Sequence, residues 1–162
     1  MPDSYYVGTA RWRTHVQATV TVLLQRLTQS DPNAGALLER SGPLPRQLGP
    51  YWRHILRQAH ANQCFWCQRT MAANGATLEH VLPYQGSSWP TLSRLEQLLS
   101  LQLSHPLCNH GYRDWRQAQA PGRLTRMDGA LIAIVRQAIA DQPVFRLYAA
   151  ARDRPDPWVS SS

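Results

Sequence analysis

The chain has 162 residues, a formal net charge of +7 and 17 basic residues, all of them arginine. This length allows one domain, or one with a small satellite, and a real hydrophobic core. The longest apolar run, residues 130–135, is far too short to span a bilayer, which argues against a membrane-spanning protein.

The arginine and cysteine contents narrow the class of protein further. The planar guanidinium suits bidentate contacts to phosphate, so nucleic acid is the first partner to consider. A GC-rich genome, which favours arginine codons, explains the missing lysine equally well and leaves that point open. Three cysteines cannot complete a disulfide framework, and the first residues, MPDSYYVGTARWR, lack the pattern of a signal peptide. We therefore expect a soluble, cytoplasmic protein.

The first third of the chain predicts three helices. Residues 1–11 have no apolar period, and we expect them to form a loose arm. From residue 12 to about residue 28 the apolar residues fall at helical spacing, and Asp31-Pro32 is a typical cap and first residue for a short helix through residue 38. The segment SGPLPRQLGP, residues 41–50, is a linker before a helix at about 51–62. The expected buried face of this last helix is Trp52, Ile55, Leu56 and Ala59, with Arg53, Arg57 and His60 off that face.

The rest of the chain predicts two short strands and three more helices. Residues 77–81 and 101–104 have the composition or alternation of strands. Between them a helix opens at Pro90-Thr91, where Ser93 and Glu96 match a capping box. Residues 108–118 are expected to be helical. The final helix, at about 125–141, has an expected buried stripe of Leu131, Ile134, Val135, Ala138 and Ile139.

Four potential ligands of a soft metal ion occur as two pairs. Cys64 and Cys67 form a CxxC, and His105 and Cys108 form an HxxC. Zinc favours tetrahedral sites built from Cys thiolates and His nitrogens at such spacings. We therefore predict a structural Cys3His zinc site, which stabilises the fold because its ligands meet only in the folded chain. A redox-active CxxC is the alternative, but the surrounding pattern is not the βαβ unit typical of that motif.

Three motifs between Cys64 and Arg113 carry a family resemblance: CFWC, TLEHVLP and LSLQLSHPLCNHGYR. Together they resemble the HNH endonucleases, specifically the zinc-containing ββα-metal type. That family has a CxxC, then an acid followed by His, a hydrophobic pair and Pro, then a strand ending in a second CxxC followed by Asn or His. EHVLP at 79–83 matches the first half, and HPLCN at 105–109 matches the second, with His105 in place of a cysteine.

The resemblance implies metal-dependent hydrolysis of DNA phosphodiester bonds, leaving a 5′ phosphate and a 3′ hydroxyl. It gives His80 the role of general base, for which a neutral histidine is suited. Glu79 and the side-chain oxygen of Asn109 match the ligands of a catalytic divalent cation, Mg²⁺ or Mn²⁺, which polarises the phosphate and stabilises the departing oxygen. Arg113, one turn beyond Asn109, is a candidate for phosphate contact, and His110 is a candidate to assist or replace Asn109.

The chain departs from the family pattern at three points. The position of the family's middle Asn, which braces the loop carrying the catalytic histidine, is occupied by Ser100. The loop between His80 and Cys108 is longer than usual and contains the helix expected at 91–99. Glu79 is a less common choice than Asp or His before the catalytic histidine, although it is still a hard oxygen ligand.

These observations predict a mainly α protein of the α+β class, with a small ββα-metal (HNH) core stapled by the Cys3His zinc site. Residues 1–50 are expected to form an N-terminal arm and helices, 51–120 the zinc-stapled nuclease core, 121–145 a C-terminal packing helix, and 146–162 a disordered tail. The expected partner is DNA, with no membrane. Whether a homodimer forms to cut both strands is left open.

Two other functions remain compatible with the sequence. One is a zinc-stapled module that binds nucleic acid without cleaving it, which the serine at position 100 favours. The other is a regulatory zinc protein that binds another protein. The tryptophans of the central region either stack on bases or cover the zinc knuckle and the core, namely Trp52, Trp66, Trp89 and Trp115.

Overall fold

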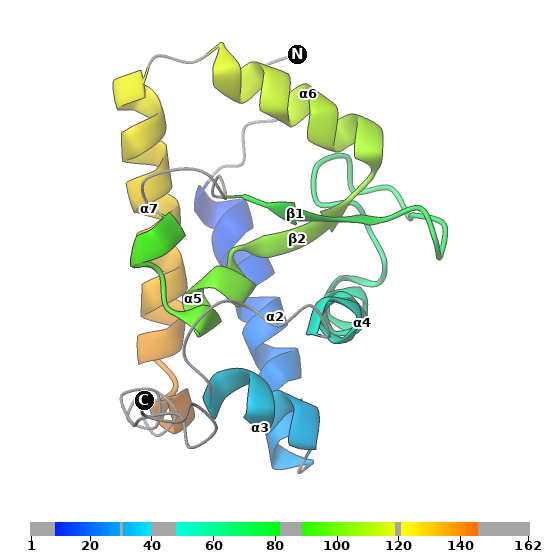
Figure 1. Ribbon diagram of the computed structural model, residues 1–162, viewed down its shortest axis with the longest axis vertical. Helices are drawn as coiled ribbons and strands as arrows, with labels where there is room; N and C mark the ends of the chain where they lie inside the picture. Colours follow the sequence, from blue (N-terminus) through cyan, green and yellow to red (C-terminus); the bar gives the residue numbers. More distant parts are fainter. Residues whose placement is uncertain (1–8, 30, 40–47, 82–88, 119–120, 146–162) are drawn as a thin grey trace, which may run out of the picture.

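The computed structural model describes residues 9–29, 31–39, 48–81, 89–118 and 121–145, without the side chains of 36–39, 48, 112–117 and 121–127. The described chain is mostly helical and contains one two-stranded antiparallel sheet (Figure 1). This confirms the mainly helical class with a small β-hairpin. The arm at 1–8, most of the expected linker and the tail at 146–162 lie outside the described residues, and no described helix is long and apolar enough to cross a membrane.

Helix α2, Thr9–Thr28, is the central element of the fold. It packs against both α4, Leu48–His60, and α7, Pro121–Ala140. The helix begins at Thr9, so the end of the expected arm is helical. The predicted apolar stripe is confirmed, because Val16, Val20 and Leu23 are buried. Their burial against two other helices supplies most of the stability that a helix of this composition needs.

Asp31 caps the short helix α3, Pro32–Glu39, as the sequence predicts. Its carboxylate accepts a hydrogen bond from the Asn33 amide at 2.9 Å and a second from the Tyr51 hydroxyl at 2.6 Å. The second bond ties the cap of α3 to the start of α4. Helix α4 begins at Leu48, so the last residues of the expected linker are helical, and Trp52, Ile55 and Leu56 are fully buried on its inner face.

Helix α5, Arg94–Leu99, starts later than the sequence suggests. The predicted cap is confirmed, since the Ser93 side chain accepts a hydrogen bond from the Glu96 amide at 3.2 Å. Pro90 and Thr91, however, belong to a separate 3-10 turn, Trp89–Thr91. The extended backbone of Ser93, with ψ at 165°, separates this turn from the helix.

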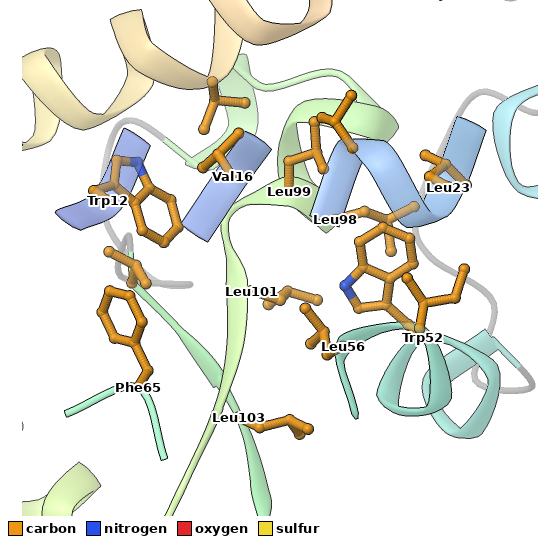
Figure 2. Close-up of a cluster of buried hydrophobic side chains, with 14 of the residues drawn as sticks. Trp12, Val16, Leu23, Trp52, Leu56, Phe65, Leu98, Leu99, Leu101 and Leu103 are labelled. Atoms are coloured by element: carbon orange, nitrogen blue, oxygen red, sulfur yellow. The ribbon is translucent and has the colours of Figure 1, made fainter. Parts of the chain in front are cut away.

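Strands β1, Thr77–His80, and β2, Leu101–Ser104, form the hairpin that the motifs require. Leu78 pairs with Leu103 and Glu79 pairs with Gln102. Because opposite residues share a face of the sheet, the three leucines Leu78, Leu101 and Leu103 lie on one side together with His80 at the strand end. Figure 2 shows Leu101 and Leu103 pointing towards Leu56 and Trp52 of the core. The second face is entirely polar and is formed by Thr77, Glu79, Gln102 and Ser104.

The C-terminal helix α7 closes the core against α2. It begins at Pro121 rather than near residue 125, and Leu131, Ile134 and Val135 of the predicted stripe are buried. Ala138 and Ile139 are only partly buried at its end. A hydrogen bond from the Trp12 indole to the Leu131 carbonyl, 3.2 Å long, joins the two helices where Trp12 is fully enclosed.

A stack of three aromatic rings lies where α2 and α4 meet, next to Phe65 of the CxxC segment at residues 64–67. The His15 ring lies 4.0 Å from the His60 ring with an interplanar angle of 5°, and Trp12 stacks on the other side of His15 at 5.1 Å. The Thr19 hydroxyl donates to the His15 carbonyl and therefore accepts from His60 Nε2 at 2.9 Å. The expectation that His60 lies off the packed face is wrong, because it completes this stack.

Burial keeps both stacked imidazoles neutral. It lowers the pKa of His60 to about 4, and it lowers the pKa of His15 well below its ordinary value with help from the neighbouring His60. The unfolded chain therefore binds more protons than the folded chain between the ordinary pKa of 6.5 and about 4. Stability is lost as the pH falls through this window, and the contribution of His60 levels off below it.

We predict that acidification from pH 7 to pH 4.5 lowers the free energy of unfolding by on the order of 2 kcal/mol more in the wild type than in His60→Gln. Glutamine keeps an N–H for Thr19 but does not titrate. Urea denaturation at each pH, with bound zinc measured in parallel, gives the difference. His54→Gln on the exposed side of α4 is the matched control and should follow the wild type. If the free energy of unfolding depends on pH equally in His60→Gln and the wild type, the claim that His60 is buried in its neutral form is contradicted.

Candidate functional site

Cys64, Cys67, His105 and Cys108, which we call the Cys3His quartet, converge on one point. Their ligand atoms all lie within 4.8 Å of one another. The His105 Nδ1 atom is 3.4 Å from the Cys67 sulfur and 3.9 Å from the Cys108 sulfur. Ideal tetrahedral zinc bonds give edges of about 3.5 Å between nitrogen and sulfur and about 3.8 Å between sulfurs. The predicted meeting of the two half-sites is confirmed, and the quartet can hold a metal ion such as zinc.

The CxxC half-site is a tight knuckle held by backbone hydrogen bonds. The Cys64 amide donates to the Arg69 carbonyl at 2.9 Å, and the Gln68 amide donates to the Cys64 carbonyl at 2.8 Å. Gln68 has a φ of 64°, which turns the chain sharply after the second cysteine. The Phe65 amide then donates to the Leu103 carbonyl at 3.0 Å, so the knuckle is attached directly to β2.

The HxxC half-site lies at the junction between β2 and helix α6, Pro106–Gln117. His105 follows the last strand residue, and its carbonyl accepts a hydrogen bond from the Asn109 amide at 3.1 Å. Pro106 suits the first position of a helix because it needs no amide donor there. Cys108 is therefore in the first turn of α6, on the same side as His105. The sequence order strand, His, Pro and helix fixes this half-site locally.

Arg11 of α2 binds the knuckle from the other side. Its guanidinium donates hydrogen bonds to the carbonyls of Phe65 and Trp66, the latter at 3.2 Å, and lies 5.1 Å from the centroid of the Phe65 ring. Burial lowers the pKa of Arg11, and the neighbouring Cys64 partly opposes that shift. Sequence periodicity does not predict this contact, because Arg11 falls in the segment expected to be a loose arm.

The three thiols strongly influence one another. Burial, together with the charge of Cys64, raises the pKa of Cys108 to about 12. Burial also opposes ionisation of Cys67, but the amide of Arg69 and the neighbouring thiols hold its pKa below the ordinary value. Three thiolates this close repel one another unless a cation lies between them. The donor set is therefore one that a divalent metal satisfies.

Glu79 points to the buried polar face of the hairpin and is only 3% exposed. Its Oε2 atom accepts a hydrogen bond from the Trp66 indole at 3.1 Å, and its Oε1 atom accepts one from the Ser104 hydroxyl. The sequence predicts that Glu79 is an oxygen ligand for a catalytic cation. Both oxygens accept hydrogen bonds within the protein and each retains a second lone pair, so the ligand role stays a prediction.

His80 lies on the opposite face of β1 from Glu79, as strand alternation requires. Its side chain is exposed, and its ring meets the Trp89 ring edge to face with centroids 4.8 Å apart. Protein atoms around the ring partly shield it from water, which lowers the pKa of His80, so the imidazole is neutral near pH 7.

Asn109 and His110 occupy the first turns of α6, where Asn109 is half-buried and His110 is exposed. The Arg113 side chain lies outside the described residues. Convergence of Glu79, His80 and Asn109 on one cation therefore stays a prediction, as do the phosphate contacts expected of Arg113 and His110.

Ser100, the residue that the sequence resemblance puts in place of a bracing asparagine, forms hydrogen bonds with both its side chain and its backbone. It is fully buried, and its hydroxyl donates to the Glu96 carbonyl at 2.7 Å, at the end of α5. Its own carbonyl accepts a hydrogen bond from the Val81 amide at 3.1 Å. The residue after His80 is therefore held by the main chain at position 100, while the side chain is used elsewhere.

Gln102 is a feature that the sequence reading missed. It is fully buried directly opposite Glu79, and within the described part of the chain neither its Oε1 nor its Nε2 atom has a hydrogen-bond partner. Alternation along β2 indicated a polar face but not that this face is enclosed. A buried amide without partners destabilises the fold.

No protein-family model, curated protein or solved structure matches this chain. The site is therefore understood from its own residues.

We predict that the purified protein binds one zinc ion per chain and that Cys108→Ser loses it. A bound metal adds four ligand bonds to the few hydrogen bonds that join the knuckle to the end of β2, so its removal by a chelator should also lower the melting temperature. Elemental analysis and a thermal melt with and without chelator measure both effects. Ser93→Ala, which removes a helix cap outside the quartet, is the control and should keep its zinc. Full zinc content in Cys108→Ser would contradict the assignment.

Gln102→Leu should raise the free energy of unfolding by about 1–2 kcal/mol in zinc-loaded protein, because leucine replaces a buried unpaired amide with an apolar group of similar volume. Urea denaturation at saturating zinc measures the change. Gln97→Leu is the matched substitution, since the Gln97 amide donates to the Leu92 carbonyl at 3.3 Å, and it should give no gain. Lower stability in Gln102→Leu would show that the amide has a bound partner.

Proposed function

We propose that the protein is a metal-dependent DNA endonuclease of the HNH type, with His80 as the general base. The observation that carries the proposal is the order of elements around the Cys3His quartet. A β-hairpin, β1 with β2, runs directly into helix α6, and the two metal half-sites lie at the knuckle and at the strand–helix junction. This is the arrangement that the sequence motifs of the ββα-metal family require.

The chemical roles follow from the positions of three side chains. The neutral, exposed imidazole of His80 suits activation of a water molecule. Glu79 and Asn109 supply the hard oxygen ligands, and when bound, a divalent cation polarises the scissile phosphate and stabilises the departing 3′ oxygen. Val81, immediately after His80, is buried and is tied to Ser100, which fixes the strand end that carries the base.

The charge of the protein supports DNA as the partner. The net charge is +7, and Arg13, Arg53 and Arg69 are exposed on α2, on α4 and in the knuckle. Exposed guanidinium groups attract the phosphate backbone and make binding depend on salt.

The tryptophans of the central region are candidates either for base stacking or for packing. Trp52, Trp66 and Trp89 are buried, which favours packing roles for these three. The Trp115 side chain lies outside the described residues.

A second candidate function is a zinc-stapled module that binds nucleic acid without cleaving it. Two observations favour it: the Glu79 carboxylate already accepts hydrogen bonds from Trp66 and Ser104, and the Ser100 hydroxyl is directed to Glu96. Such a module would bind DNA with strong salt dependence and would leave the backbone intact in any divalent metal.

We predict that the zinc-loaded protein nicks supercoiled plasmid with Mg²⁺ or Mn²⁺ and that His80→Ala lowers the rate by about 10²–10⁴-fold, because the general base is lost. The assay compares nicked and supercoiled plasmid over time, with EDTA as the blank. His54→Ala, another exposed histidine, should cut like the wild type. Zinc content and melting temperature are measured for every variant, so that loss of fold is not read as loss of chemistry.

Binding measurements on the same samples separate the two candidate functions. Salt-sensitive DNA binding without nicking in Mg²⁺, Mn²⁺, Ca²⁺ or Co²⁺ would favour the binding module and contradict the nuclease. Equal nicking by the wild type and His80→Ala would contradict the assigned base.

A further inference from the structure

Glu79, on the polar face of the strand pair, contacts a sequence neighbour of each half of the Cys3His quartet. Trp66 is one of the two residues between Cys64 and Cys67 in the CxxC. Ser104 directly precedes His105 of the HxxC. The Glu79 carboxylate accepts a hydrogen bond from each of them, through Oε2 and Oε1 respectively. We propose that Glu79 is a positioning residue of the metal quartet, whose carboxylate holds the two half-sites in register.

The hydrogen bonds reach close to the ligands themselves. The single hydroxyl proton of Ser104 is donated to Glu79, so the His105 carbonyl, 3.1 Å from the same oxygen, is its alternative acceptor. Glu79 therefore acts on His105 through the position of the residue that directly precedes it. On the other side, the Trp66 carbonyl accepts a bond from Arg11 while its indole binds Glu79, which fixes both ends of this residue. The knuckle therefore has one support from α2 and another from β1.

Burial makes these bonds strong. Glu79 is 3% exposed, Trp66 is 4% exposed and Ser104 is fully buried. Hydrogen bonds between enclosed groups are not weakened by competition with water, and a buried donor that loses its acceptor destabilises the site. Loss of an outer partner of a metal ligand typically lowers metal affinity roughly 10- to 100-fold. This role goes beyond the proposed nuclease activity and does not depend on it.

The chemistry of the network predicts different outcomes for two substitutions at Glu79. Glutamine can keep the network: its oxygen accepts from the Trp66 indole, its NH₂ donates to the Ser104 oxygen, and the Ser104 hydroxyl turns to the His105 carbonyl. Alanine removes both acceptors and leaves the buried donors of Trp66 and Ser104 unpaired. Glu79→Gln is therefore the conservative variant that restores positioning without the charge.

The test measures zinc affinity by competition with a chromophoric chelator, and the coordination geometry from the visible absorption bands of the Co²⁺-substituted protein. We expect Glu79→Ala to bind zinc roughly 10- to 100-fold more weakly with altered Co²⁺ bands. Glu79→Gln should stay within about threefold of the wild type, with unchanged bands. Trp66→Phe and Ser104→Ala should each weaken binding in the direction of Glu79→Ala. These two variants keep the proposal testable where Glu79→Ala fails to fold.

Two buried residues of the same types serve as matched controls. The indole nitrogen of Trp52 has no hydrogen-bond partner in the described chain, and the Ser100 hydroxyl binds Glu96 rather than Glu79. Trp52→Phe and Ser100→Ala should lower stability without changing zinc affinity or the Co²⁺ bands. The proposal is overturned if Trp66→Phe and Ser104→Ala bind zinc as tightly as the wild type. It is also overturned if the two control variants lose as much zinc affinity as these two do.

Cleavage measured on the same variants separates this role from the proposed function. Glu79→Gln removes the charge of a hard-cation ligand, so a nuclease that uses Glu79 should lose activity in this variant at saturating zinc. Normal zinc binding without cleavage in Glu79→Gln supports both roles. Cleavage at the wild-type rate would remove Glu79 from the catalytic ligands and leave its positioning role intact. Unchanged zinc affinity in Glu79→Ala, together with loss of cleavage, would remove the positioning role and keep Glu79 among the catalytic ligands.

Discussion

The convergence of two cysteine–histidine half-sites is the constraint on which the centre of this protein depends. The knuckle and the strand–helix junction are far apart in sequence, and each forms by local rules, a tight turn in one case and a proline-started helix in the other. The Cys3His quartet joins them. It thereby fixes the direction in which α6 leaves the hairpin, and so the position of Asn109 relative to the strand that carries Glu79 and His80.

The hairpin separates two environments across one short sheet. Its apolar face completes the core with Leu56 and Trp52, and its polar face is enclosed rather than exposed. This enclosure gives the Glu79 carboxylate desolvated, directional partners and leaves the Gln102 amide without any in the described chain. His80, one residue away, remains at the surface. Two consecutive residues of one strand, Glu79 and His80, thus lie in different surroundings, one enclosed and one exposed.

Most of the secondary structure was predictable because it rests on local patterns. The stripes of α2 and α7, the Asp31 and Ser93 caps, and the meeting of the quartet all follow from spacing and residue type. The rest depends on contacts between distant segments. Which face of β1 is enclosed, the stacking of His15 on His60, and the binding of Arg11 to the knuckle are decided by tertiary packing, which single-sequence periodicity does not encode. The helical start at Thr9 and the 3-10 turn at Pro90 show the same limit at element boundaries.

The proposed function rests on one arrangement, in which the strand pair and α6, joined at the Cys3His quartet, hold Glu79, Asn109 and the base His80 around one hard cation. Paramagnetic broadening by Mn²⁺ is the sharpest test, because the broadening depends steeply on distance from the ion. In an NMR titration of zinc-loaded protein, we expect the His80 ring and the Asn109 side-chain amide to broaden first and together. Broadening that begins elsewhere, or that reaches Asn109 while the His80 ring stays sharp, would contradict it.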